Sequence, residues 1–219
     1  MLALQFAPKG GSRRRLQILA IGAHCDDVDI GCGGAMLALL QRHDADVTWV
    51  VFAANAIRER EFRASAARFL RGARNARLIV HKFRDGFFPA QYLAIKEAFE
   101  GLKNEPNPDV IFSHRRADLH QDHRIVAELT WNTFRDHLIL EYEVAKYEGD
   151  LTTPSSYIEL TRAQMERKIA ILWSCYKTQR AKRWFTPDTF RALMRIRGIE
   201  SGGKSGWAEG FHASKTLLG

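Results

Sequence analysis

Short apolar runs alternate with amphipathic segments along most of the chain. Runs of strand length occur at residues 16–23, 46–54, 76–83, 108–114 and 138–144. Segments with helical patterning occupy residues 33–42, 59–70, 89–103, 122–134 and 162–176. Phe62, Ala66 and Phe69, for example, would share one face of a helix. The alternation predicts strands that are connected by helices.

Short strands that alternate with helices are typical of a parallel sheet covered by helices on both faces. We therefore predict an α/β fold, a Rossmann-like three-layer sandwich with a mostly parallel sheet and an active site at the C-terminal strand ends. The chain is long enough for one compact domain with a substantial core, so we expect a single domain over residues 1–219. From about residue 187 the pattern weakens, and we expect the glycine-rich stretch at 198–215 to form less regular loops.

The composition is that of an ordinary globular protein, with 46% hydrophobic and 26% charged residues. No apolar run approaches the roughly 20 residues that span a bilayer. The first residues lack the order of basic and apolar positions that marks a signal peptide. Three cysteines without a CxxC pair argue against a disulfide framework or a zinc finger. We expect a cytoplasmic protein without a membrane span.

The net charge of +8 raises the question of a nucleic-acid partner. The basic residues are dispersed, however, with local clusters at residues 13–15, 58–63 and 180–183. A dispersed basic surface is more typical of general solvation, or of attraction to an anionic small substrate, than of a nucleic-acid footprint. We therefore expect no nucleic-acid partner.

Two polar clusters follow two of the predicted strands. The first comes after the strand at 16–23 and contains His24, Asp26, Asp27 and Asp29. The second follows the strand at 108–114 and contains His114, Asp118, His120, Asp122 and His123. Parallel strands end at the same edge of a sheet, so we expect the two clusters to meet there.

A metal would explain this concentration of imidazoles and carboxylates. A catalytic zinc takes three protein ligands of these types and keeps one position open for water. A His-x-x-Asp pair from the first cluster and a histidine from the second would supply such a set. A neighbouring carboxylate that is not a ligand can act as base toward the water.

Simpler interpretations apply to some of these residues. Gly31, Gly33 and Gly34 lack the GxGxxG spacing of a dinucleotide-binding turn, and the adjacent carboxylates would repel a pyrophosphate. These glycines more simply allow a tight turn and close packing of a helix on the sheet. We interpret Asp29 as a helix cap. The thiol of Cys25 is a further candidate nucleophile, although it lies among the presumed metal-site residues.

The motifs also resemble those of a known family. AHCDD followed by GCGG, with DLHQDH further on, resembles the LmbE-like (PIG-L) family of zinc-dependent N-deacetylases. RERE at 58–61, RDGFF at 84–88, the segment 168–179 and AEGF at 208–211 resemble later segments of the family, so the resemblance covers nearly the whole chain. It implies a zinc-dependent N-deacetylase whose substrate is a small acetamido sugar such as N-acetylglucosamine, for example in a polysaccharide precursor. The surplus of basic residues is compatible with a nucleotide-linked or phosphorylated sugar.

The resemblance also implies roles for individual residues. His24, Asp27 and His123 would bind Zn²⁺. Asp26 would act as general base, and His120 would help to stabilise the oxyanion.

Three further residues receive weaker roles from the resemblance. Asp122 would orient one of the histidines. Arg58 and Asp85 are candidates for holding sugar hydroxyls or an anionic group.

The chain departs from the family pattern at two places. Cys25 replaces the usual proline, which removes a fixed φ, and Val28 with Asp29 replaces the usual step that contains glutamate. Neither change affects a presumed ligand or the base. Two other functions remain open from the sequence: an amidase or deformylase acting on a sugar conjugate, and a non-catalytic sugar-binding relative.

Overall fold

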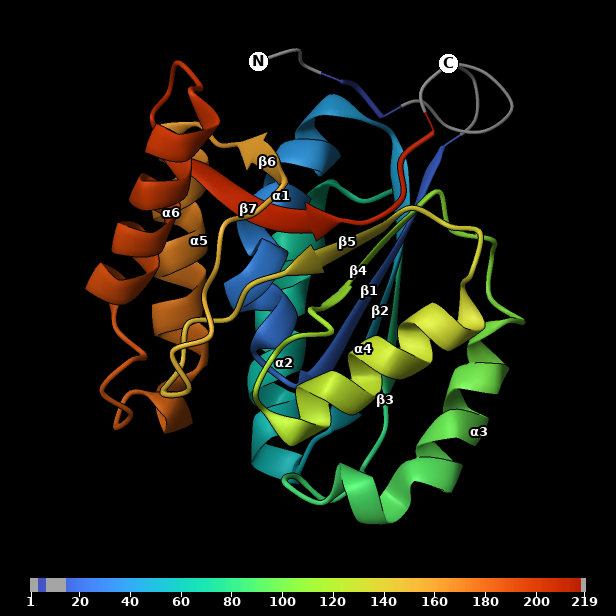
Figure 1. Cartoon of the computed structure of the whole chain (residues 1–219). Helices are drawn as coiled ribbons and strands as arrows, with labels where there is room; N and C mark the ends of the chain where they lie inside the picture. Colours follow the sequence, from blue (N-terminus) through green and yellow to red (C-terminus); the bar gives the residue numbers. More distant parts are fainter. Residues whose placement is uncertain (1–3, 7–14, 218–219) are drawn as a thin grey trace.

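The described part of the chain forms one mostly parallel, seven-stranded sheet with helices on both faces (Figure 1). This computed structural model describes residues 4–6 and 15–217. The strands are β1 (Leu16–His24), β2 (Ala45–Ala53), β3 (Asn75–Val80), β4 (Val110–His114), β5 (Ile139–Tyr142), β6 (Ser156–Glu159) and β7 (Ala208–Ala213). Their order is β3-β2-β1-β4-β5-β7-β6, and β7 runs in the opposite direction to the other six of these strands.

The helices form two layers around the sheet. They are α1 (Asp27–Arg42), α2 (Ala56–Phe69), α3 (Tyr92–Leu102), α4 (Gln121–Thr133), α5 (Arg162–Cys175) and α6 (Pro187–Ser201). Short 3₁₀ turns are η1 (Leu70–Gly72), η2 (Phe88–Gln91) and η3 (Lys177–Gln179). Helices α3 and α4 cover one face of the sheet, and the other four cover the opposite face (Figure 1). The predicted three-layer α/β fold is confirmed.

The two polar clusters lie at one edge because of the strand order. Strand β1 pairs in parallel with both β2 and β4, so the ends of β1 and β4 are neighbours. The chain leaves β1 toward one side of the sheet and β4 toward the other. Ligands bind at such a reversal in open α/β sheets.

The C-terminal part is more regular than the sequence indicated. We expected less regular loops from about residue 187, but Pro187 begins the helix α6, and Gly202 ends it with a φ of +64°. The glycine-rich stretch then continues into β7, which pairs with β5 on one side and β6 on the other. Strand β6 was not predicted.

Helix α1 begins earlier than predicted, at Asp27 instead of residue 33, so the glycines lie inside it. A Cβ atom on Gly31 would lie 2.2 Å from the ring of Tyr142. Close packing of α1 on β5 therefore requires glycine at this position.

An ion pair is inserted into the backbone ladder of α1. The helix is kinked at Cys32, whose φ of −142° is not helical. The N–H groups of Gly34 and Ala35 donate to the Glu209 carboxylate at 2.8 and 2.6 Å. The Lys168 ammonium, 2.5 Å from Glu209, donates to the Ile30 carbonyl that Gly34 would otherwise bond. Residues from α5 and β7 thus supply the hydrogen bonds that the kink removes.

We predicted that Asp29 caps a helix, and this was wrong. Asp29 is a buried side chain inside α1. The hydroxyl of Ser65 in α2 donates to its Oδ1. The hydroxyl of Tyr176, which follows α5, lies 2.9 Å from its Oδ2. The carboxyl joins three helices, and burial raises its pKa to about 8.

Within residues 4–6 and 15–217, no helix has the length and apolarity that a membrane span requires. The interpretation of the chain's first residues, and of Arg13 and Arg14, lies outside the described residues.

We predict that Lys168→Met lowers the free energy of unfolding by about 3–5 kcal/mol, because it leaves the buried Glu209 carboxylate without its cation. Urea denaturation measures the change. Lys96→Met is the matched control, since Lys96 pairs with Glu100 on the exposed side of α3 and should matter far less. Equal effects of the two changes would contradict the role assigned to the buried pair.

A second prediction concerns pH. Because the pKa of Asp29 is about 8 in the folded protein and 3.8 ordinarily, the folded state binds more protons between these values. Stability from this group is complete below pH ~4 and is lost toward pH ~8, at up to about 1.4 kcal/mol per pH unit. Asp29→Asn, which mimics the protonated acid, should remove that slope. Urea unfolding from pH 5 to 8 with a chelator present tests it; a pH-independent difference between variant and wild type would refute it.

Candidate active site

A cavity of about 690 Å³ opens at the carboxyl ends of the central strands. It contains most of the residues predicted for the site, which are His24, Asp26, Asp27, Arg58, Asp85, His120 and His123. The remaining one, Asp122, is fully buried behind them. The two polar clusters meet, as the strand order requires.

Three side chains in this cavity form a group that could hold a metal ion: His24, Asp27 and His123. The Nδ1 atom of His24 lies 3.2 Å from Nε2 of His123 and 3.3 Å from Oδ2 of Asp27. The other Asp27 oxygen lies 3.5 Å from Nε2 of His123. Two imidazole nitrogens and a carboxylate that converge on one point are a donor set suited to zinc.

Carboxylates orient both imidazoles from behind. Nδ1 of His123 lies 3.0 Å from Oδ2 of Asp118, which also lies 3.1 Å from the Lys146 ammonium. Nε2 of His24 lies 3.2 Å from Oδ2 of Asp122. Each histidine therefore directs its remaining nitrogen toward Asp27, as metal ligands commonly do.

Two overlapping groups are less suited to a metal. One combines His24 and His120 with Asp122, and the other combines His123 with His114 and Asp118. Asp122, His114 and Asp118 do not line the cavity, so each of the two groups lies partly behind it. Both oxygens of Asp122 already accept backbone N–H groups, from Gly86 at 2.7 Å and from Phe88 at 3.2 Å.

The charges of the central group support one another. Burial opposes a charge on Asp27, but His123, His114 and His24 outweigh it and hold its pKa well below the usual range. Burial likewise opposes a charge on His24, and the nearby carboxylates of Asp27, Asp122 and Asp85 raise its pKa. The pocket floor thus attracts positive charge.

Asp26 lies beside the group and is held by an arginine. Nη2 of Arg58 donates to its Oδ1 at 2.5 Å. Nη1 of the same guanidinium donates to Glu61 and to Thr178, each at 3.2 Å. The structure therefore places Arg58, a sequence candidate for substrate binding, against the side chain of Asp26.

His120 has a defined tautomer. Its Nδ1 accepts the backbone N–H of Asp122 at 3.3 Å, so Nε2 carries the proton when the ring is neutral. Burial and the neighbouring His123 and His24 lower its pKa. His120 is therefore a neutral N–H donor in the cavity near pH 7.

Asp85 lies at the cavity entrance. Its side chain is 77% exposed, and Oδ1 lies 3.1 Å from Nε2 of His24. It is thus accessible to a ligand while in contact with the candidate metal group.

Cys25 is excluded as a nucleophile. The side chain is buried, and the thiol donates to the carbonyl of Ala53 at 3.6 Å. Burial raises the pKa of the thiol to about 12, so it stays protonated at neutral pH.

Sequence reasoning gave no role to several residues that support the site. His114 and Asp118 stood in the second polar cluster, and this was their signal. His114 is buried, with Nε2 3.0 Å from Oδ2 of Asp27. Lys146 carries no local sequence signal, because only the fold brings it to the site. For Tyr176 the only signal was its place in the segment 168–179 that resembles the family.

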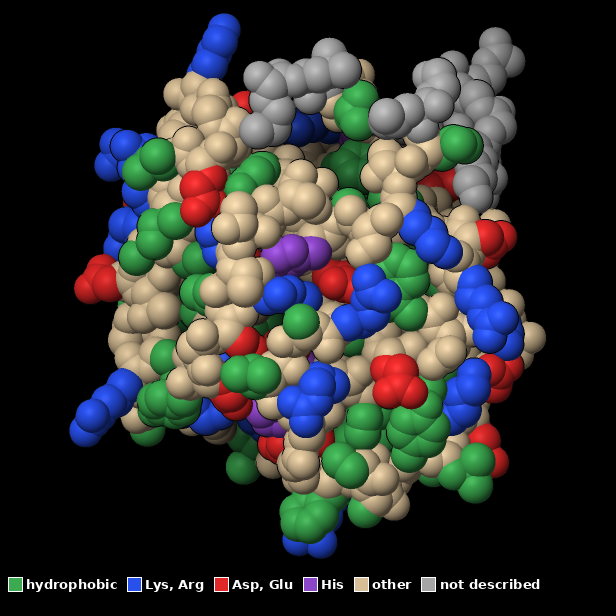
Figure 2. All heavy atoms as spheres, in the orientation of Figure 1, with side chains coloured by type: hydrophobic (Ala, Val, Ile, Leu, Met, Phe, Trp, Pro, Cys, Tyr) green, Lys and Arg blue, Asp and Glu red, His purple; other side chains and the backbone are tan. Residues whose placement is uncertain are grey.

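The basic residues do not form one patch. Figure 2 shows lysine and arginine side chains spread over the visible face. Three cations line the cavity toward solvent: Lys82, Arg84 and Lys182. No carboxylate in the described part of the chain pairs with Arg84 or Lys182, and Lys82 lies 4.0 Å from Glu59. Arg58 and Lys146, deeper in the cavity, are both paired.

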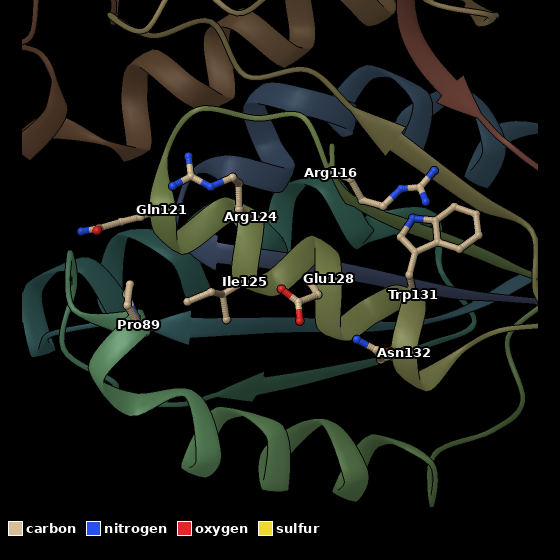
Figure 3. A pocket seen from close by; sticks show the side chains of 8 residues that line it. All are labelled: Pro89, Arg116, Gln121, Arg124, Ile125, Glu128, Trp131 and Asn132. Carbon is tan, nitrogen blue, oxygen red and sulfur yellow. The ribbon is translucent and has the colours of Figure 1, made fainter.

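A second hollow of about 420 Å³ lies on the outer side of α4 (Figure 3). Its charged groups bind neighbours within the protein. Arg116 contacts Glu141 at 2.9 Å and lies over the ring of Trp131, and Glu128 accepts the hydroxyl of Tyr92 at 2.8 Å. This hollow contains no candidate ligand or nucleophile among its lining residues.

Solved structures share the fold. N,N'-diacetylchitobiose deacetylase from Pyrococcus horikoshii is 19% identical over 92% of this chain and 84% of its own, with a TM-score of 0.65. The A40926 pseudoaglycone deacetylase Dbv21 is 17% identical over 94% of this chain and 100% of its own, with a TM-score of 0.67. GalB, the 4-carboxy-2-hydroxymuconate hydratase from Pseudomonas putida KT2440, is 13% identical over 93% and 98%, with a TM-score of 0.70. The fold therefore accommodates more than one reaction.

Sequence comparison identifies the family. No curated protein has a significant match to the chain. The family model PIG-L, described as GlcNAc-PI de-N-acetylase, matches residues 19–134, which is more than half of the chain and includes both polar clusters. The chain belongs to the PIG-L family.

Proposed function

We propose that the protein is a zinc-dependent hydrolase that removes the N-acetyl group from an acetamido sugar. The convergence of His24 Nδ1, His123 Nε2 and the Asp27 carboxylate in a 690 Å³ cavity, with Asp26 beside them, carries the proposal. The two deacetylases of similar fold, which are named for N,N'-diacetylchitobiose and for the A40926 pseudoaglycone, support it.

His24, Asp27 and His123 would hold the zinc. When bound there, zinc supplies Lewis acidity toward the amide carbonyl and makes hydroxide available near neutral pH. Asp118 and Asp122 keep the two imidazoles directed at that position.

Asp26 is the general base in this proposal. Arg58 binds its Oδ1, which leaves Oδ2 to take a proton from the attacking water and to return it to the leaving amine. His120 donates a hydrogen bond from its Nε2–H to the oxyanion that develops on the acetyl carbonyl, and the proton stays on the ring. In this proposal, Asp26 transfers the proton and His120 stabilises the negative charge.

We further propose that the sugar carries a phosphoryl group, as in a sugar phosphate or a nucleotide-linked sugar. The lining cations Arg84 and Lys182 lack carboxylate partners among the described residues, and Lys82 has only a distant one. An anionic group on the substrate would pair with these cations at the entrance, while the acetamido group reaches the deeper carboxylates.

Replacement of the base should separate catalysis from metal binding. Asp26→Asn is expected to lower the rate of acetate release by about 100- to 10,000-fold, because the base is lost, and to retain one zinc per chain. Acetate assays and metal analysis measure both quantities. Asp136→Asn, a change at a side chain that is 89% exposed, is the control and should leave both unchanged. A fully active Asp26→Asn variant, or full activity without metal, would contradict the proposal.

The substrate proposal is tested with N-acetylglucosamine, its 1-phosphate and its nucleotide-diphosphate form. Arg84→Ala/Lys182→Ala should raise KM for the charged substrates about tenfold, leave the neutral sugar unaffected, and weaken the effect of salt. Arg183→Ala, at the exposed neighbour that does not line the cavity, is the control. Equal KM values for neutral and charged sugars in the wild type would refute the phosphoryl group. Release of formate from N-formyl sugars, or of another acid from other amide conjugates, without acetate from any acetamido sugar would favour a deformylase or an amidase.

A further inference from the structure

Tyr176 is a buried side chain with a direct contact to the segment that carries the base. The residue follows α5 and is fully buried. Its hydroxyl donates to the carbonyl oxygen of Cys25 at 2.6 Å. That carbonyl belongs to the peptide group that joins Cys25 to Asp26. The hydroxyl of Tyr176, at the end of α5, therefore contacts the peptide group directly before the proposed base.

The carbonyl of Cys25 depends on this contact. Cys25 lies between the end of β1 and the start of α1, and the first bond of the helix runs from the N–H of Ile30 to Asp26. No backbone N–H of the described residues donates to the Cys25 carbonyl. A buried carbonyl without a partner is costly, so Tyr176 fixes the orientation of a peptide group that the secondary structure leaves free.

The same tyrosine also supports the side chain of Asp26. The Arg58 guanidinium lies 5.4 Å from the centre of the Tyr176 ring, within the range of a cation–π contact. Arg58 in turn donates to Oδ1 of Asp26 at 2.5 Å. The hydroxyl of Tyr176 thus holds the backbone before Asp26, and its ring supports the arginine that holds the carboxylate.

The local sequence explains why such a support is needed. A cysteine leaves φ free to vary, whereas a proline at residue 25 would fix it. To take a proton from a water molecule, the carboxylate of Asp26 must also stay next to the candidate metal ligands His24, Asp27 and His123.

We propose that Tyr176 is a positioning residue for the base Asp26, acting through the Cys25 carbonyl and the Arg58 guanidinium. The proposal rests on the proposed hydrolase function, because it assigns Tyr176 to the orientation of that reaction's base. Loss of orientation affects turnover more than substrate binding, since the substrate contacts at the cavity entrance are untouched.

The test compares two buried tyrosines. Tyr176→Phe keeps the ring and removes the bond to Cys25. Tyr142→Phe is the matched control, because Tyr142 is equally buried and its hydroxyl donates to the carbonyl of Ile21 in β1 at 2.7 Å. Both variants lose one buried hydrogen bond to a backbone carbonyl, and Tyr176→Phe also loses the contact with Asp29 Oδ2. Urea midpoints show whether both variants remain folded and how much stability each loses.

The expected result is a kinetic difference between the variants. Tyr176→Phe should lower kcat by about 10- to 100-fold, with KM within about twofold and zinc content unchanged, while Tyr142→Phe stays within about twofold of wild type. Hydrogen–deuterium exchange of the segment 25–29 should accelerate in Tyr176→Phe and not in Tyr142→Phe. Equal kcat values for the two folded variants would overturn the proposal, as would unchanged exchange in Tyr176→Phe.

The two proposals fail in different ways. If the wild type with bound zinc releases no acetate from any acetamido sugar, the proposed function is wrong, and the exchange measurement still decides whether Tyr176 holds the turn. If the wild type is active and Tyr176→Phe matches it in kcat, only the positioning role is wrong. A Tyr176→Phe variant that does not fold is replaced by Arg58→Lys, which should lower kcat without accelerating exchange at Cys25.

Discussion

The architecture of this protein depends on the ion pair between Lys168 and Glu209, which occupies a gap in the hydrogen-bond ladder of α1. Without these two side chains, the carbonyl of Ile30 and the N–H of Gly34 would be buried without partners at the kink. The pair connects α1 to α5 and to β7: Lys168 lies 138 residues from Ile30 along the chain, and Glu209 lies 175 residues from Gly34. Its two members come from the segments 168–179 and 208–211, which we had singled out in the sequence.

The site beside this helix is built from alternating charges. Glu61 holds Arg58, which holds Asp26, and Asp27 lies between His24 and His123. Behind His123 the alternation continues through Asp118 to Lys146. Buried charges are tolerated only when they are paired, so the position of each residue in this network depends on its neighbours.

Much of the fold and of the site could be predicted from local patterns. Strands β1 to β5 and the helices between them follow the periodicity of apolar residues, and the polar clusters follow from the parallel strand ends. The four-residue strand β6 and the glycine-rich segment before β7 have no such periodicity. Pairing within the sheet stabilises these strands, and a local sequence pattern does not reveal that pairing. Asp29 resembles a cap locally; its true partners, Ser65 and Tyr176, are 36 and 147 residues away.

Asp122 serves two structures at once, and this limits how the protein can diversify. Its carboxylate orients His24 and also accepts the N–H groups of Gly86 and Phe88, next to Asp85 in the loop at the cavity entrance. Gly86 adopts a φ of +76°, which other residues rarely do. An insertion or deletion in this loop would therefore disturb the imidazole as well as the entrance. Within this loop, a new substrate preference would arise by exchanging the side chains of the lining residues 84 and 85 on an unchanged backbone.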